Sequence, residues 1–197
     1  MARWVISGLA LMPGAVLAQT TCPVPGDMVT GVRVHYSATV YEQFAQDPDN
    51  ATAILSEGYV DGQLYLRKVL AAGIYLESAS VDQTRSGEVV PLVENTYETT
   101  PTVPLPDSQW TLHVTVSSQT GPVTYEDQWS YWTGPVETIQ FGDCPVRVFY
   151  FDFKEAIAPN DPSRFMYLPD FGFMIDARPE SQDPNSQDYQ PFWMEPL

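Results

Sequence analysis

The amino-acid sequence predicts an all-β domain of mainly antiparallel strands, with at most one or two short helices. Three observations favour this fold class. Short apolar runs alternate with polar residues, turn signals containing Gly or Pro recur between these runs, and no long stretch repeats apolar residues at helical spacing. This pattern is typical of a β-sandwich or of a curved, half-open barrel, and it does not distinguish these two architectures.

The N-terminal residues predict a signal peptide. Arg3 is followed by a largely apolar run over residues 4–16, and Val16 and Ala18 occupy the −3 and −1 positions of a cleavage site. The apolar run is too short to span a bilayer. We therefore expect cleavage after Ala18, a secreted or periplasmic location, and no integral membrane segment in the mature chain.

The length of 197 residues suits one domain with its own hydrophobic core. The predicted organisation is a signal peptide over 1–18, a single β-rich domain over 19–177, and a disordered acidic tail over 178–197. Residues 191–194 are apolar again, so the end of this tail either frays or docks back on the domain.

Charge and cysteine content exclude some functions. The chain has 9 Lys and Arg against 25 Asp and Glu, for a net charge of −16, and a field of this sign repels nucleic-acid phosphates. We therefore expect no nucleic-acid partner. Cys22 and Cys144 are the two cysteines, and in an oxidising compartment we expect them to form a structural disulfide.

The first elements follow from local patterns. Alternation of apolar and polar residues over 29–41 predicts a half-buried strand. The cluster at 47–50 ends this strand, and Asn50 is placed to cap a short helix over 51–57 that Gly58 closes. Further strands are expected over 63–70, 74–81 and 88–93, the first two joined as a hairpin by the turn 71–73.

The clearest hairpin joins strands over 109–118 and 123–132. Before it, three prolines within 99–106 exclude a central strand and predict an extended loop. If residues 118 and 123 lie opposite each other, the hairpin has one aromatic, apolar face and one polar face. Asp127 is the misfit on the apolar face, and a bulge or a sheet edge would accommodate it.

The last strands surround the most apolar run of the chain. Residues 146–153 are apolar on both faces, which predicts a central strand covered on each side, with Phe149, Phe151 and Phe153 in the core. A strand over 136–141 precedes this run. Residues 166–168 and 171–175 predict a final hairpin.

No motif for catalysis or for a metal is present in the sequence. Gly-x-Ser-x-Gly and His-Glu-x-x-His are both absent, and the acidic stretch starting at Asp47 lacks the ligands of a calcium loop. His35 and His113 lie on polar faces of the predicted strands, where we expect solvated side chains. Asp152 and Glu155 flank Lys154 and are interpreted as a solvated strand end. We therefore predict no catalytic residue, no metal ligand and no cofactor.

Aromatic residues are the one suggestive group. Trp110, Trp129, Tyr131 and Trp132 are the candidate binding residues, either as a stacking platform for a sugar or peptide or as the lining of an apolar pocket. The competing interpretation is that these rings fill the core. Trp132 distinguishes the two, because the alternation places it on the face opposite Trp129 and Tyr131.

These observations favour an exported soluble β-domain that acts as a non-enzymatic binding or structural module in the periplasm. Its partner would be a protein or a glycan. The alternative is a carrier that holds an apolar ligand in a half-open barrel. A hydrolase using a histidine or a pair of carboxylates ranks third, since no sequence motif supports it.

Overall fold

The structure is a computed structural model that describes residues 21–82, 89–118, 123–157, 162–176 and 191–197. These residues form an antiparallel sheet of thirteen strands that is not closed into a barrel, and a short 3-10 helix, η1 (Pro25–Val29). The predicted all-β, mainly antiparallel fold class is confirmed. The architecture agrees with either of the two expected forms, a sandwich or a half-open barrel.

Thirteen strands make up this sheet. In chain order they are β1 (Val32–His35), β2 (Val40–Gln46), β3 (Ala53–Val60), β4 (Gln63–Ala71), β5 (Tyr75–Asp82), β6 (Val89–Tyr97), β7 (Gln109–Ser118), β8 (Val123–Thr133), β9 (Glu137–Phe141), β10 (Cys144–Glu155), β11 (Ser163–Leu168), β12 (Phe173–Asp176) and β13 (Trp193–Pro196). Their order across the sheet is β12-β11-β10-β8-β7-β6-β5-β4-β3-β2-β1-β13, and β9 pairs with β10.

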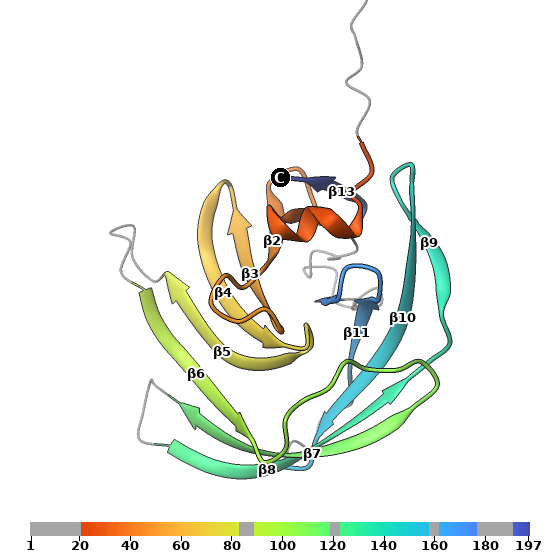
Figure 1. The fold of residues 1–197 in the computed structure, drawn as a ribbon. Coiled ribbons are helices and arrows are strands. Elements are labelled where there is room, and N and C mark those ends of the chain that lie inside the picture. The colour runs from red at the N-terminus through yellow and green to blue at the C-terminus, as the bar shows by residue number, and fades with distance from the viewer. Residues whose placement is uncertain (1–20, 83–88, 119–122, 158–161, 177–190) are drawn as a thin grey trace, which may run out of the picture.

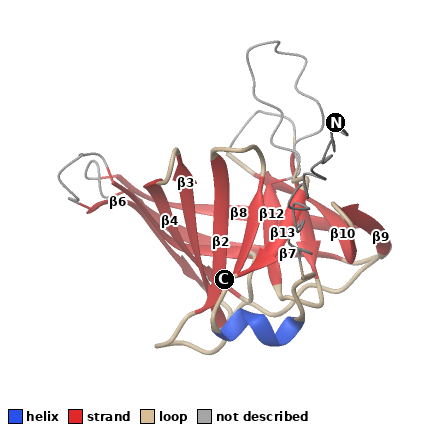
Figure 2. Cartoon of the chain, turned by 90° about the horizontal axis from the view of Figure 1, so that it is seen from above, coloured by secondary structure: helices blue, strands red, loops and turns tan. Residues whose placement is uncertain are grey.

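The sheet rolls up on itself. Figure 1 looks into this curl, with β2 to β8 and β10 following its rim and β11 lying inside. Helix η1 crosses one end of the strands, as Figure 2 shows. Because of this curl, side chains of β1 and β2 share one hydrophobic cluster with side chains of β10, β11 and β12.

Two hydrophobic clusters form the core, one on each face of β10. Val146 and Val148 point into the first cluster, where the rings of Phe44 and Phe173 stack with their centroids 4.0 Å apart. Phe149 and Phe151 point into the second cluster, together with Trp129 and Tyr131. Both faces of β10 thus carry buried side chains, as predicted, but Pro145, Arg147 and Lys154 are exposed, so neither face is covered along its whole length. Phe153 is only half-buried.

The hairpin of β7 and β8 has the predicted register. Ser118 pairs with Val123, so Leu112 lies opposite Trp129 and Val114 lies opposite Asp127. Leu112, Val114 and Trp129 are buried, as the aromatic, apolar face required. The alternation of the sequence and the short connection between the strands together fix this register.

Two local predictions at the N-terminal end are wrong. The helix expected over 51–57 is absent, because residues 53–60 form β3, whose backbone pairs with β2 on one side and β4 on the other. The single strand expected over 29–41 is interrupted by a bend at 36–39, which folds β2 back against β1. Pairing with neighbouring strands outweighed the capping signal of Asn50.

The predicted disordered tail is also wrong for its last residues. Strand β13 (Trp193–Pro196) pairs antiparallel with β1, Val32 lying opposite Pro196, and Met194 is fully buried in the first cluster. The docking alternative therefore holds for β13. Residues 177–190, the rest of the expected tail, lie outside the described residues.

The predicted disulfide is confirmed. Cys22 and Cys144 are bonded, with their Cα atoms 5.4 Å apart, and the bond ties the segment before η1 to the start of β10. A bond of this kind fits an extracellular or periplasmic protein. Within the described ranges, no helix has the length and hydropathy needed to cross a membrane. The predicted signal peptide, residues 1–18, lies outside the described residues.

Candidate functional site

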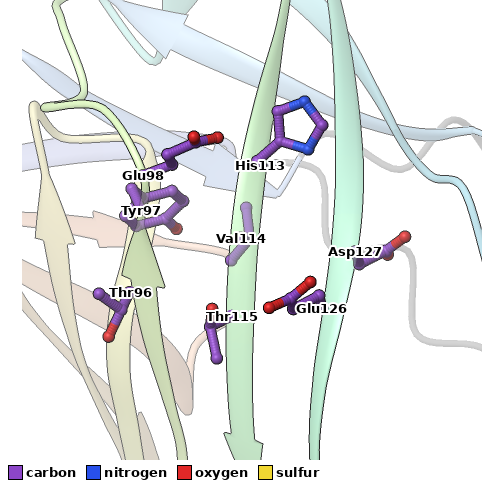
Figure 3. Close-up of a pocket in the computed structure, with 8 residues that line it drawn as sticks. All are labelled: Thr96, Tyr97, Glu98, His113, Val114, Thr115, Glu126 and Asp127. Atoms are coloured by element: carbon purple, nitrogen blue, oxygen red, sulfur yellow. The ribbon is translucent and has the colours of Figure 1, made fainter.

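A polar hollow of about 370 Å³ lies on β6, β7 and β8. Its polar side chains are Thr96, Glu98, His113, Thr115 and Glu126, most of them exposed to solvent (Figure 3). Figure 3 also shows that Glu126 and the next residue, Asp127, point to opposite sides of β8. Within the described part of the chain, His113 has no carboxylate at salt-bridge distance. An exposed imidazole without such a partner lacks the orienting group of a catalytic base.

A larger hollow of about 840 Å³ lies at the end of the curl that η1 crosses. Its walls are η1, the β2–β3 and β4–β5 turns, and residues 100–103. Burial raises the pKa of Glu77 in this wall, and the nearby Asp47 raises it further. The lining mixes polar and apolar side chains from several strands and turns, and Glu77 is the one charged side chain among its described residues.

The strongest candidate is an apolar groove of about 260 Å³ between β4–β5 and the strands β8, β10, β11 and β12. We call it the aromatic groove. Five of its lining residues are aromatic, three are aliphatic or Met, and two are charged: Trp129, Tyr131, Phe151, Phe153, Phe165, Ile74, Leu76, Met174, Lys68 and Glu155. Ligand sites in proteins are commonly concave and apolar, with a few polar groups that fix orientation.

Strand alternation places the main wall of the groove. Odd-numbered residues of β8 and β10 point to the same side, and the two strands pair with Glu155 opposite Trp129 and Phe153 opposite Tyr131. Directly opposed side chains in an antiparallel pair lie within contact distance. Trp129 and Phe153 meet edge to face, with their centroids 5.1 Å apart. The groove therefore has a continuous aromatic wall that ends at the carboxylate of Glu155.

Asp127 fixes the orientation of Trp129. Its Oδ2 accepts a hydrogen bond of 2.9 Å from the indole Nε1, and its Oδ1 accepts hydrogen bonds from the backbone N–H groups of Gln128 and Ile157. These three donors explain how a carboxylate is buried on the apolar face of β8. No bulge occurs at Asp127, but the pairing of β8 with β10 ends at Trp129, so Asp127 lies at an edge of the sheet on that side, one of the two expected solutions. Its hydrogen bonds satisfy the carboxylate there.

The charge of Lys68 is already neutralised. Its Nζ lies 2.6 Å from Oε1 of Glu42, a buried carboxylate that also accepts hydrogen bonds from Ser56 Oγ and Tyr36 O–H. Burial raises the pKa of the Tyr36 hydroxyl well above its usual value, and the charge of Glu42 adds to this shift. Lys68 therefore brings an ion pair to the groove, not a free cation.

Glu155 has a different environment. It is half-buried, and no hydrogen bond or ion pair of its side chain occurs among the described residues. Burial raises the pKa of this carboxyl, and the carboxylate of Asp127 raises it further. Both causes disfavour the ionised carboxylate, so a positively charged group placed beside Glu155 would stabilise it.

The structure separates the predicted aromatic residues. Trp110 stacks on Tyr131 with centroids 5.1 Å apart, and Trp129 lies in the same cluster. Trp132 is half-buried and lies on the opposite side of β8, as the alternation predicted. Trp129 and Tyr131 line the aromatic groove, Trp110 lies beside Tyr131 on the neighbouring strand, and Trp132 is not part of this site.

The two histidines differ. His113 is exposed, as expected, but His35 is buried, so its prediction as a solvated residue is wrong. Its Nε2 lies 3.0 Å from Oε1 of Glu195, and its ring stacks on Trp193 with centroids 4.4 Å apart. The partners of His35 thus come from β13, and they hold that strand in place.

Sequence reasoning missed Glu155, which it placed at a solvated strand end. The signal was available, because the alternation through Phe149, Phe151 and Phe153 extends to residue 155 and puts it on the inner face. Phe165 and Met174 were also missed. Their place in the groove depends on how β11 and β12 fold inside the curl, and the sequence of a single strand does not predict this packing.

The aromatic groove is suited to binding. Its described lining is mostly aromatic and aliphatic, and its two charged side chains are Glu155 and Lys68, of which Lys68 is ion-paired with Glu42. Among the described residues, no group of three or more His, Cys, Asp or Glu is arranged to hold a metal ion. Comparison with protein-family models, with curated proteins and with solved structures found no match to this chain.

Proposed function

We propose that the protein is an exported, non-enzymatic binding module that holds a small, largely apolar ligand in the aromatic groove. One observation carries the proposal: five aromatic side chains converge on a groove that ends at a carboxylate without a partner in the described chain. Trp129, Tyr131 and Phe151 are buried and also belong to the core, but Phe153 and Phe165 remain half-buried along the groove, which disfavours the alternative that the rings only fill the core.

The size of the groove limits the ligand. A volume of about 260 Å³ lies just below the range of about 300–1,000 Å³ that is common for small-molecule sites. The ligand is therefore a small molecule, or one apolar group of a larger molecule. An apolar ligand of this size is closer to the carrier alternative than to a module that binds a protein or a glycan.

Export is part of the proposal. The disulfide supports an oxidising compartment, and the leader over residues 1–18 supports secretion with cleavage after Ala18. The measurement is a mass spectrum of unreduced protein exported by its own leader. The expected mass begins at Gln19 and is lighter by the hydrogens lost when Cys22 and Cys144 pair. An intact leader, or two free thiols, would overturn this part of the proposal.

Native mass spectrometry of the same sample tests the binding function. We expect an adduct on the wild-type protein that is lost on denaturation and absent from Phe153→Ala, which removes one wall of the groove. The control is Val123→Ala at the exposed start of β8, which should retain the adduct. The proposal fails if the wild-type protein is bare and no apolar compound changes its tryptophan fluorescence, or if Phe153→Ala binds as wild type does.

A further inference from the structure

We infer that the ligand of the aromatic groove is an organic cation, with its ammonium group beside Glu155 and its alkyl groups against Trp129 and Phe153. This inference rests on the proposed function, because it assigns a chemical class to the ligand of the same groove.

The aromatic rings of the groove favour a cationic ligand. Aromatic faces carry a partial negative charge and attract cations within about 6 Å, tryptophan most strongly. Trp129 and Phe153 lie edge to face, 5.1 Å between centroids, and Tyr131 packs on Phe153 at 5.3 Å. Glu155 is directly opposite Trp129 across the two strands. A cation in this corner therefore meets both aromatic rings and a carboxylate.

The charged side chains around Glu155 also favour a cation. Asp127, on β8, uses its oxygens for three N–H donors but still adds negative charge. Lys68, on β4, is paired with Glu42 at 2.6 Å and contributes no net charge. An anionic ligand would face the carboxylate of Glu155 and the nearby negative charge of Asp127, and a neutral one would leave Glu155 unpaired. A cation avoids the electrostatic repulsion and also pairs with Glu155.

The character of the groove narrows the class of cation. A small metal ion needs several oxygen, nitrogen or sulfur ligands, whereas the described groove offers one free carboxylate among apolar side chains. An ammonium ion with alkyl substituents is weakly hydrated and suits apolar walls. The net charge of −16 raises the local concentration of any such cation near the protein.

A pair of isosteric probes tests the inference. Choline carries a trimethylammonium group, and 3,3-dimethylbutan-1-ol carries a neutral tert-butyl group of the same shape. Titration calorimetry on the full mature chain should show choline binding at least about tenfold more tightly than the neutral alcohol. Glu155→Gln should weaken choline binding about tenfold and leave the affinity for the alcohol unchanged.

Glu126→Gln is the matched control, because it removes the same charge from the exposed side of β8 and should leave both affinities unchanged. Circular dichroism checks that each variant is folded. Failure of choline to bind, equal binding of the two probes, or equal losses in the two variants would each overturn the inference. Binding of the neutral alcohol alone would overturn it while retaining the proposed function. If neither probe binds and the native spectrum is bare, both proposals fail.

Discussion

At the scale of single residues, Asp127 shows how a charged side chain is tolerated on an apolar face. It is 6% exposed and accepts hydrogen bonds from the Trp129 indole and from two backbone N–H groups. Removing a buried acceptor leaves its donors unsatisfied, which typically costs about 1–3 kcal/mol, and more when the acceptor is charged. Asp127 therefore stabilises the inner wall of the groove as well as the strand that carries it.

We expect Asp127→Ala to lower the free energy of unfolding by about 3 kcal/mol, because three donors lose their acceptor. Urea unfolding at neutral pH, followed by tryptophan fluorescence, measures this loss. Glu126→Ala is the control on the same strand, and its exposed side chain predicts a change within about 0.5 kcal/mol. Equal stability of the two variants would contradict the role assigned to Asp127.

Glu155 predicts a pH dependence of stability in the ligand-free protein. Burial and Asp127 raise the pKa of its carboxyl above 4.5, so the folded state holds this proton more tightly than the unfolded chain does. Its contribution to stability is fully present below the unfolded pKa and is lost as pH rises through the folded pKa. Ionised Glu155 therefore opposes folding at neutral pH.

Glu155→Gln should accordingly raise the melting temperature at pH 7, and the difference from wild type should shrink as the pH falls and vanish at about pH 3, where the carboxyl is protonated in both the folded and the unfolded chain. Thermal unfolding at several pH values measures this difference. Glu126→Gln controls for the loss of one negative charge from the acidic chain. If Glu155→Gln raises the melting temperature equally at both pH values, the groove does not raise the pKa of the Glu155 carboxyl.

At the scale of elements, two turns meet inside the curl. The β4–β5 turn and the β11–β12 turn approach so closely that a Cβ atom at Gly73 would overlap the carbonyl oxygen of Gly172. Gly73 also has a φ of +74°, and its carbonyl accepts a hydrogen bond of 2.9 Å from Met174 N. This contact positions β12, and hence Met174, against the groove.

We expect Gly73→Ala to destabilise the protein by at least about 2 kcal/mol more than Gly62→Ala does. Gly62 has a nearly equal φ of +75°, but a Cβ atom there meets nothing within 4 Å. The pair thus separates backbone strain from the close approach of the two turns. Urea unfolding of both variants provides the comparison, and equal losses would show that the turns move apart easily.

Sequence patterns predicted elements whose structure is set by near neighbours. The register of β7 and β8 followed from alternation and a short turn, and the two apolar faces of β10 followed from residues 146–153. β3 was missed because its strand conformation depends on pairing with β2 and β4. β13 was missed because its partner, β1, lies at the other end of the chain, where no local pattern reports the pairing.

The groove was predictable only in part, for the same reason. Trp129 and Tyr131 were identified because aromatic residues alternating on one strand are visible in the sequence. The opposite wall, formed with Leu76 and Met174, depends on the curl of the sheet. The buried state of His35 depends on β13, so a reading of its own strand could only suggest a solvated side chain.

At the scale of the whole molecule, the disulfide joins the segment before η1 to β10 across a separation of 122 residues. Cross-links that close long loops restrict the unfolded chain, and loss of a native disulfide typically costs about 2–5 kcal/mol. We expect the double variant Cys22→Ser/Cys144→Ser to lose stability in this range in urea unfolding. Wild-type protein treated with a reductant should lose a similar amount. An unchanged midpoint in both samples would contradict this prediction.

The pairing of β1 with β13 also governs the order in which the protein can be completed. Val32 emerges early during synthesis, but its partner Pro196 is added only after every other strand of the sheet. Until then β1 has β2 on one side and an open edge on the other, and open edges recruit strands from other chains. A chain that is released before residue 193 would therefore keep this open edge permanently, and it would lack Met194, which is buried in the same hydrophobic cluster as Val32 and Val34.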